Sequence, residues 1–219
     1  MSSAAGAGAR FTLVLPVQSA ARAKSRLVAP QGVDHAALAR AIATDALGAV
    51  RACDRVGRRV VVTSDPVIGP AALERGDVVV ADPDSGLTAA VSAGVARARR
   101  LDPDGAIGVL LVDLPALTAA DLAVALDAAA AHPRCVVADT EGTGTVLLTA
   151  LAGVELSHAF GAGSAARHVA LGAVLLDLDL PRLRRDVDTA AALRAATVLG
   201  LGAGTAAVLR DALCATTPR

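Results

Sequence analysis

The chain has 219 residues, of which 54% are hydrophobic and 1% aromatic, and its 21 Lys and Arg balance its 21 Asp and Glu. A net charge of zero gives no global basic field for polyanions, and the scarcity of aromatic rings excludes single-stranded nucleic acid bound by stacking. No window of about 18 residues lacks charges and helix breakers, so no membrane span is expected. Cys53, Cys135 and Cys214 are odd in number and widely spaced, which is typical of a reducing cytoplasm.

Short β-branched runs alternate with longer Ala- and Leu-rich stretches along the chain. In chain order the pattern predicts strand 11–17, helix 35–53, strand 59–63, helix 71–75, strand 78–81, helix 87–100, strand 107–112, helix 119–132, strand 135–138 with a continuation near 145–148, helix 164–171, strand 174–178, and helices 190–198 and 205–213. Asp34, Thr118 and Ser164 are candidate helix caps. The alternation predicts an α/β fold, a single-domain, mixed but mostly parallel sheet flanked by helices. Ligands bind such sheets beyond the carboxyl ends of the strands, near a topological switch point.

The loop after the first predicted strand gathers positive charge. It carries Arg22, Lys24 and Arg26, with hydroxyls at Ser19 and Ser25. Facing a triphosphate, Lys24 would act as a point charge and Arg26 as a bidentate donor. The loop has no Walker glycine pattern, and an ordinary solvated basic loop is the alternative.

Asp113 ends the apolar run Leu110–Val112, and Pro115 stops the strand just beyond it. A carboxylate at the end of a buried strand is typical of a metal ligand. A turn residue that bonds its own backbone is the alternative.

Asp186 and Asp188 stand two residues apart in a segment that reads as extended. Alternate residues of an extended chain point the same way, so the two carboxylates would share a face. Together with Asp113 they make an all-oxygen set suited to Mg²⁺. Pairing with Arg184 or Arg185 is the alternative.

Two glycine-rich segments follow, 141–145 and 160–168. Glycine lets the backbone approach an anion, and the second segment opens a helix whose first amides favour a phosphate or carboxylate. Arg167 and His168 lie near the start of that helix, where cations are unfavourable unless an anion is near. The first segment can instead be a hairpin turn, and Ser164 can be a cap only.

Five motifs then form an ordered set: Pro-Val-x6-Lys-Ser-Arg-Leu, Asp-Leu-Pro-Ala-Leu, Gly-Thr-Gly-Thr, Phe-Gly-x-x-Ser-x-x-Arg-His and Asp-Val-Asp-Thr. The set resembles the CofC/FbiD family, which guanylylates 2-phospho-L-lactate or phosphoenolpyruvate on the route to the deazaflavin coenzyme F(420). The resemblance covers about residues 11 to 213. It implies a nucleotidyltransferase fold, GT-A-like and Rossmann-like, in one domain over 11–214, with residues 1–10 as a disordered N-terminal tail.

The resemblance also implies an activity, the transfer of GMP from GTP to phosphoenolpyruvate with release of pyrophosphate and with Mg²⁺ as cofactor. The residues it implies are Lys24, Arg26, Asp113 and Asp186 for catalysis, Asp113, Asp186 and Asp188 for the metal, Lys24, Arg26 and Thr88 for the nucleotide, and Thr145, Gly161 and Ser164 for the phosphorylated acid. Phosphoenolpyruvate is ranked first because the Ala- and Arg-rich composition is similar to that of actinobacterial members, which use it.

Three alternatives stay open: 2-phospho-L-lactate as the acceptor, a related nucleotidyltransferase with another acceptor, and a non-catalytic nucleotide-binding paralogue. Gln18, Thr88 and Ala192 stand where family members usually carry Lys, Asn and Asp. We expect a cytoplasmic protein with no nucleic-acid or membrane partner, whose product is handed over to the next enzyme of the route if that product is unstable. Its oligomeric state is left open.

Overall fold

The computed structural model describes residues 10–20, 29 and 32–216, with side chains as far as residue 212. Within these ranges seven strands form one sheet in the spatial order β3-β2-β1-β4-β6-β5-β7. Their bounds are β1 (Phe11–Pro16), β2 (Val56–Val62), β3 (Val78–Val80), β4 (Ile107–Leu110), β5 (Arg134–Ala138), β6 (Thr145–Ala150) and β7 (Val174–Leu175). All neighbouring strands are parallel except β6, which is antiparallel to both β4 and β5. The predicted mixed, mostly parallel sheet is confirmed.

The strand order reverses between β1 and β4. From β1 the chain builds outward through β2 to β3, and then returns to add β4 on the other side of β1. The connections that leave β1 and β4 therefore diverge, which opens the crevice where α/β sheets bind ligands. Because β6 is antiparallel to β4, it begins at the edge where β4 ends.

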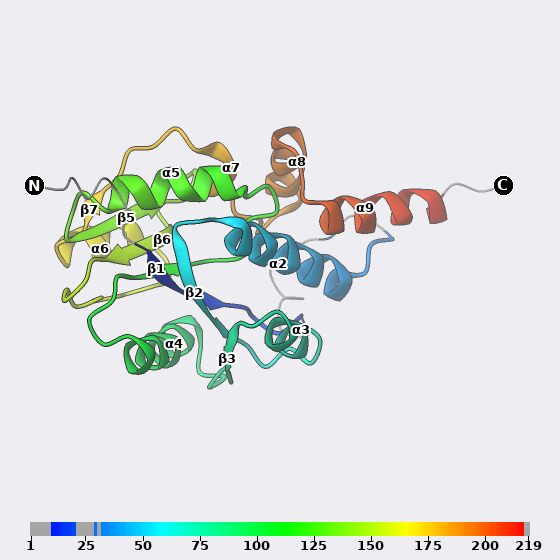
Figure 1. The fold of residues 1–219 in the computed structure, drawn as a ribbon. Coiled ribbons are helices and arrows are strands. Elements are labelled where there is room, and N and C mark those ends of the chain that lie inside the picture. Colours follow the sequence, from blue (N-terminus) through cyan, green and yellow to red (C-terminus); the bar gives the residue numbers. More distant parts are fainter. Residues whose placement is uncertain (1–9, 21–28, 30–31, 217–219) are drawn as a thin grey trace, which may run out of the picture.

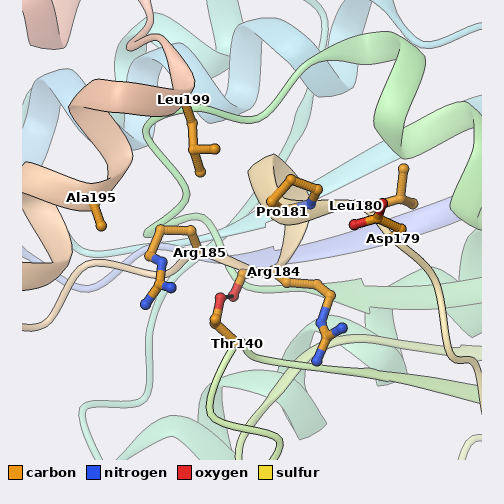
Figure 2. Close-up of a pocket in the computed structure, with 8 residues that line it drawn as sticks. All are labelled: Thr140, Asp179, Leu180, Pro181, Arg184, Arg185, Ala195 and Leu199. Carbon is orange, nitrogen blue, oxygen red and sulfur yellow. Dashed lines mark hydrogen bonds between the residues drawn. The ribbon is translucent and has the colours of Figure 1, made fainter.

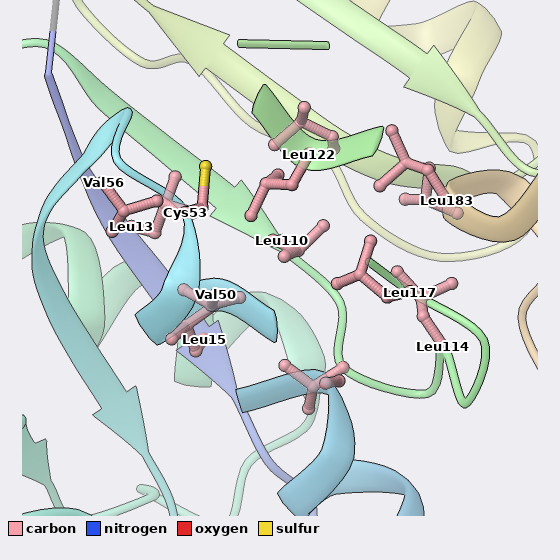
Figure 3. Close-up of a cluster of buried hydrophobic side chains, with 14 of the residues drawn as sticks. Leu13, Leu15, Val50, Cys53, Val56, Leu110, Leu114, Leu117, Leu122 and Leu183 are labelled. Atoms are coloured by element: carbon pink, nitrogen blue, oxygen red, sulfur yellow. The ribbon is translucent and has the colours of Figure 1, made fainter. Parts of the chain in front are cut away.

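Helices cover both faces of the sheet (Figure 1). Their bounds are α2 (His35–Ala52), α3 (Ile68–Glu74), α4 (Leu87–Leu101), α5 (Ala119–Ala129), α6 (Ser164–Ala170), α7 (Pro181–Arg184), α8 (Ala190–Leu199) and α9 (Ala203–Thr216). Apolar residues of α2, α5 and α7 pack on one face, and those of α4 on the other. Figure 3 shows the hydrophobic cluster on the face covered by α2, α5 and α7, which includes Leu13, Leu110 and Leu122. None of the helices in the described ranges is long and apolar enough to cross a lipid bilayer.

Most predicted elements are confirmed, and the differences have local causes. Strand β2 begins at Val56, earlier than residue 59, because it pairs with β1 from Phe11 onward. The predicted continuation of β5 is a separate strand, β6, that runs the opposite way. Helix α7 was not predicted; it is one turn long and begins at Pro181, a residue suited to a first helical position.

Candidate active site

The carboxyl ends of β1 and β4 and the start of β6 lie at one edge of the sheet. The N–H of Leu111 donates to the carbonyl of Val146 at 3.0 Å, which extends the pairing of β4 with β6. Thr145 precedes Val146 on the antiparallel strand, so it lies beside the turn that carries Asp113. Two candidate subsites, one for a metal and one for an acid, therefore meet at the same edge.

The segment with Asp186 and Asp188 lies along the turn after β4. The N–H of Val187, which stands between them, donates to the carbonyl of Asp113 at 3.0 Å. This hydrogen bond joins two parts of the chain that are far apart in sequence. It holds both carboxylates close enough to Asp113 to act on its charge. The structure thus places Asp186 and Asp188 within electrostatic reach of Asp113.

One oxygen of the Asp113 carboxylate, Oδ1, is buried and has no hydrogen-bond partner among the described residues. Burial, and then repulsion from Asp186 and Asp188, raises the pKa of Asp113 to about 7. Burial, and then Asp188 and Asp139, raises the pKa of Asp186 to about 6. The arrangement is one that a bound cation would stabilise.

The donor set fits a magnesium ion that shares its ligands with a substrate. In the described ranges, no three His, Cys, Asp or Glu side chains gather closely enough to hold an ion by themselves. Magnesium commonly takes one or two protein carboxylates and completes its shell with water and substrate phosphate oxygens. Asp113 and Asp186 are two such carboxylates, and the more exposed Asp188 lies beside them.

Among the described contacts, neither Arg184 nor Arg185 pairs with Asp186 or Asp188, so the alternative that they neutralise these aspartates is wrong. The guanidinium of Arg184 donates to the carbonyls of Ala138 and Asp139 at 3.1 and 3.0 Å. Arg185 pairs with Glu141 at 3.0 Å. Both cations tie the 184–188 segment to the turn between β5 and β6, so they support the acidic segment without cancelling its charge.

A buried polar chain lies at the start of β6 and α6. Ser164 Oγ is 3.0 Å from Thr145 Oγ1, and Thr145 Oγ1 is 2.9 Å from His168 Nδ1. The N–H of Ala159 donates to His168 Nε2 at 2.9 Å. The prediction that Ser164 caps the helix is wrong: Gly163 is the cap, and the Ser164 hydroxyl faces Thr145.

Gly161 shapes the turn that leads into α6. Its φ of +116° lies in a region that L side chains rarely adopt, and its carbonyl accepts from the N–H of Ser164 at 3.0 Å. The turn is closed by Arg167, which donates to the carbonyls of Ala159 and Ala162. Thr145, Gly161 and Ser164 are therefore neighbours, as the motifs led us to expect.

The argument that two cations in α6 call for an anion is wrong. Burial, and then His158 and Arg167, lowers the pKa of His168 to about 4, so its ring is neutral at physiological pH. The guanidinium of Arg167 is already bonded to carbonyls. The case for an anion subsite is carried by the hydroxyls of Thr145 and Ser164 instead.

The Gly-Thr-Gly-Thr motif is a hairpin turn, the alternative to an anion-binding loop. The carboxylate of Asp139 accepts from the N–H groups of Thr143 and Gly144 at 2.9 and 2.7 Å. The carbonyl of Thr143 accepts from the N–H of Ala165, which ties the turn to α6. The turn amides are thus occupied within the protein, and the motif serves to position Thr145.

Lys24 and Arg26 lie outside the described residues, but the start of their loop is visible. The N–H of Ala20 donates to the carboxylate of Asp65 at 3.1 Å. The other nucleotide candidate, Thr88, lies exposed in the first turn of α4, after Gly86 with φ of +92°. Helix α4 follows β3, which is parallel to β2 and β1, so its first turn comes after the edge where these strands end.

Comparison with known proteins decides the family. The phosphoenolpyruvate guanylyltransferase of Thermomonospora curvata is 46% identical over 200 residues, which cover 90% of this chain and 88% of that protein. The phosphoenolpyruvate guanylyltransferase of Streptomyces coelicolor is 47% identical over 210 residues, covering 94% and 99%. This chain belongs to the phosphoenolpyruvate guanylyltransferase family. No family model matches the chain.

Solved structures agree on the fold of this phosphoenolpyruvate guanylyltransferase family member. A nucleotidyl transferase from Methanothermobacter thermautotroptrophicus has a TM-score of 0.54 at 17% identity, covering 89% of this chain and 98% of that chain. A Desulfovibrio desulfuricans protein assigned as a nucleotide-diphospho-sugar transferase has a TM-score of 0.63 at 13% identity, covering 93% and 95%. A Mycobacterium tuberculosis protein in complex with manganese has a TM-score of 0.53 at 18% identity, covering 86% and 97%. The fold is a nucleotidyltransferase fold.

This family member also has a cavity of about 290 Å³ that is lined partly by α7 and α8 (Figure 2). Residues of α7 and the chain on either side of it, of α8 and of the turn after β5 line it: Thr140, Asp179, Leu180, Pro181, Arg184, Arg185, Ala195 and Leu199. None of the candidate metal or acceptor residues is among them, so this cavity is separate from the candidate acid subsite.

Three residues that position the site were not given that role from the sequence. Asp65 holds the start of the basic loop, Asp139 holds the hairpin, and His168 holds Thr145. Burial alone would raise the pKa of Asp65, but hydrogen bonds, first from Ala20 and Arg40, lower it below its ordinary value. In the sequence, His168 appeared only as a cation in the Phe-Gly-x-x-Ser-x-x-Arg-His motif, and the two aspartates carried no local signal.

Proposed function

We propose that this protein transfers GMP from GTP to phosphoenolpyruvate. An oxygen of the acceptor phosphate attacks the α-phosphorus of GTP, a new phosphoanhydride forms, and the bond to pyrophosphate breaks. The observation that carries the proposal is the shielded Oδ1 of Asp113, which has no hydrogen-bond partner among the described residues and lies beside Asp186 and Asp188. Relatives that are 46% and 47% identical and bear this activity as their name support the choice of reaction.

In this proposal Asp113 and Asp186 hold Mg²⁺, and Asp188 helps to orient the ion's surroundings. When bound, the ion would neutralise charge on the phosphates and on the departing pyrophosphate. Lys24 and Arg26 add positive charge at the triphosphate, and Thr88 contacts the nucleotide. An ionised acceptor phosphate needs no general base, so the protein's task is positioning and charge neutralisation.

The acceptor acid is bound by Thr145, Gly161 and Ser164 in this proposal. Thr145 and Ser164 are buried neighbours at the edge where Asp113 lies, and Gly161 gives the backbone its close turn. An acid held there has its phosphate next to the proposed metal ligands. An in-line transfer requires the acceptor phosphate and the nucleotide to be held side by side in this way.

A pyrophosphate-release matrix tests the function. The purified protein is incubated with Mg²⁺, each of four nucleoside triphosphates, and either phosphoenolpyruvate or 2-phospho-L-lactate. We expect release with GTP and phosphoenolpyruvate. Faster release with 2-phospho-L-lactate would support the alternative acceptor, and binding of GTP without release would support a non-catalytic paralogue.

Variants test the residues. Asp113→Asn and Asp186→Asn should each lower the turnover number by at least about a hundredfold, the scale of losing one group that stabilises transition-state charge. Asp177→Asn is the matched control, since Asp177 is exposed and outside the site. Near-normal turnover in either site variant, with the fold intact by circular dichroism, would refute the metal assignment.

The cellular setting is part of the same proposal. We infer a cytoplasmic enzyme of coenzyme F(420) biosynthesis, with one catalytic domain over residues 11–214 and a hand-over of its product to the next enzyme. Residues 1–9 of the expected tail lie outside the described residues.

A further inference from the structure

The hydrogen bonds that link Ala159, His168, Thr145 and Ser164 determine which atoms of this group donate and which accept. The N–H of Ala159 donates to Nε2 of His168, so Nε2 must offer a lone pair. A neutral imidazole with an acceptor at Nε2 carries its proton on Nδ1. The ring is fully buried, and burial also disfavours the doubly protonated form. Nδ1–H therefore donates to Oγ1 of Thr145 at 2.9 Å.

This assignment leaves one hydroxyl proton over. Thr145 Oγ1 accepts from His168, and one O–H bond lies between Thr145 and Ser164, at 3.0 Å. If Ser164 donates to Thr145, the Thr145 proton is left over; if Thr145 donates to Ser164, the Ser164 proton is left over. Among the described residues neither hydroxyl makes another hydrogen bond. In both cases the pair presents a donor that lacks an acceptor.

Surrounding contacts keep the ring in place. Phe160 meets the His168 ring edge-on, with centroids 4.9 Å apart. His168 and Ser164 stand on the same short helix, whose start is held by the carbonyl of Thr143. The imidazole is therefore a fixed donor that cannot rotate to offer a lone pair to Thr145.

We propose that His168 is a positioning residue that commits the Thr145–Ser164 hydroxyl pair to donate a hydrogen bond to an anionic oxygen of the acceptor acid. The inference rests on the proposed function, because it takes the pair to face the acceptor. It assigns the acceptor's chemical class: an acid whose phosphate or carboxylate accepts from the pair. A protonated amine in the same place would have no lone pair with which to accept this hydrogen bond.

A nitrogen NMR experiment on the wild-type protein tests the tautomer without any assay of activity. Histidine is labelled with ¹⁵N, and His168 is assigned by its loss in His168→Asn. Between about pH 6 and pH 8 we expect a neutral ring with the proton on Nδ1 and a bare Nε2. A proton on Nε2, or a doubly protonated ring in this range, would overturn the proposal.

Two conservative variants test the donor itself. The side-chain amide of Asn reaches the place of Nδ1 and can donate to Thr145, whereas that of Gln reaches the place of Nε2 and bonds only Ala159. His168→Gln should raise the KM for phosphoenolpyruvate about tenfold, the effect of one lost hydrogen bond to an ion, with the KM for GTP unchanged. His168→Asn should stay within about threefold of the wild type. His132→Gln, in the connection between α5 and β5 and outside the site, is the matched control.

The outcomes separate this proposal from the proposed function. Equal losses in the Gln and Asn variants, or a wild-type KM in His168→Gln, would refute the donor role while the enzyme still turns over. Should the wild type release no pyrophosphate with either acid, the proposed function fails, and the NMR result still decides whether His168 directs the hydroxyls.

Discussion

In the metal-free protein, replacing Asp113 by Asn should stabilise the fold at alkaline pH. The folded state raises the pKa of Asp113 from its ordinary 3.8 to about 7, chiefly through burial and then through Asp186 and Asp188. Between these values the native protein holds a proton that the unfolded chain has released. Stability therefore falls as the pH rises from about 4 to about 7, and the loss is complete above about 7. Asn has no charge to develop, so its advantage grows over the same interval.

The size of the effect follows from the shift. About three pKa units correspond to about 4 kcal/mol, at 1.36 kcal/mol per unit. Water reaches part of the residue, and Asp186 titrates together with it, so we expect about 2 kcal/mol at pH 8 and less than half of that at pH 5. For a chain of this length, 2 kcal/mol raises the melting temperature by about 4 to 8 °C.

The assay is thermal unfolding in EDTA at both pH values, with Asp177→Asn as the control for loss of one carboxylate. An Asp113→Asn variant no more stable than wild type at pH 8, or stabilised equally at pH 5, would contradict the reasoning. Replacing EDTA by Mn²⁺ should stabilise the wild type at pH 8 and leave Asp113→Asn unchanged, because a cation relieves repulsion that the variant lacks.

Other substitutions separate positioning from stability. Asp65→Ala should lower the free energy of unfolding by about 3 kcal/mol, because it removes the ion pair with Arg40 and leaves the N–H of Ala20 without its acceptor. It should also raise the KM for GTP. An unchanged KM would show that Asp65 does not help to position the nucleotide loop. Gly161→Ala should cost about 1–2 kcal/mol of backbone strain, measured by urea unfolding, because Gly161 has a φ of +116°. It should also raise the KM for phosphoenolpyruvate. A variant with wild-type stability and KM would contradict the role of this backbone conformation. Asp45→Ala should cost about 1–2 kcal/mol in urea unfolding, because Asp45 accepts from the N–H and the hydroxyl of Thr205 at the start of α9. An unchanged stability would contradict this role of Asp45.

The strand–helix alternation could be read from the sequence because each element carries its own local signal. Buried strands such as 107–110 are continuous apolar runs, and helices such as 119–129 begin with a capping residue, here Thr118. The end of the apolar run also singled out Asp113, and alternation in an extended segment paired Asp186 with Asp188. Their approach to Asp113 involves a long-range hydrogen bond, from the N–H of Val187 to the carbonyl of Asp113, that the sequence does not reveal.

Other features were decided by the tertiary structure alone. The direction of β6 is set by its antiparallel pairing with β4 and β5, and no residue of β6 predicts this pairing from the sequence. Asp65 and Asp139 look like ordinary surface aspartates in the sequence, yet each is buried and accepts hydrogen bonds from backbone N–H groups. The tautomer of His168 follows from the N–H of Ala159, nine residues before it, and from the hydroxyl of Thr145 on β6. Sequence spacing determines which side chains share a face of one element, but the proton a buried group holds depends on neighbours that only the folded chain brings to it.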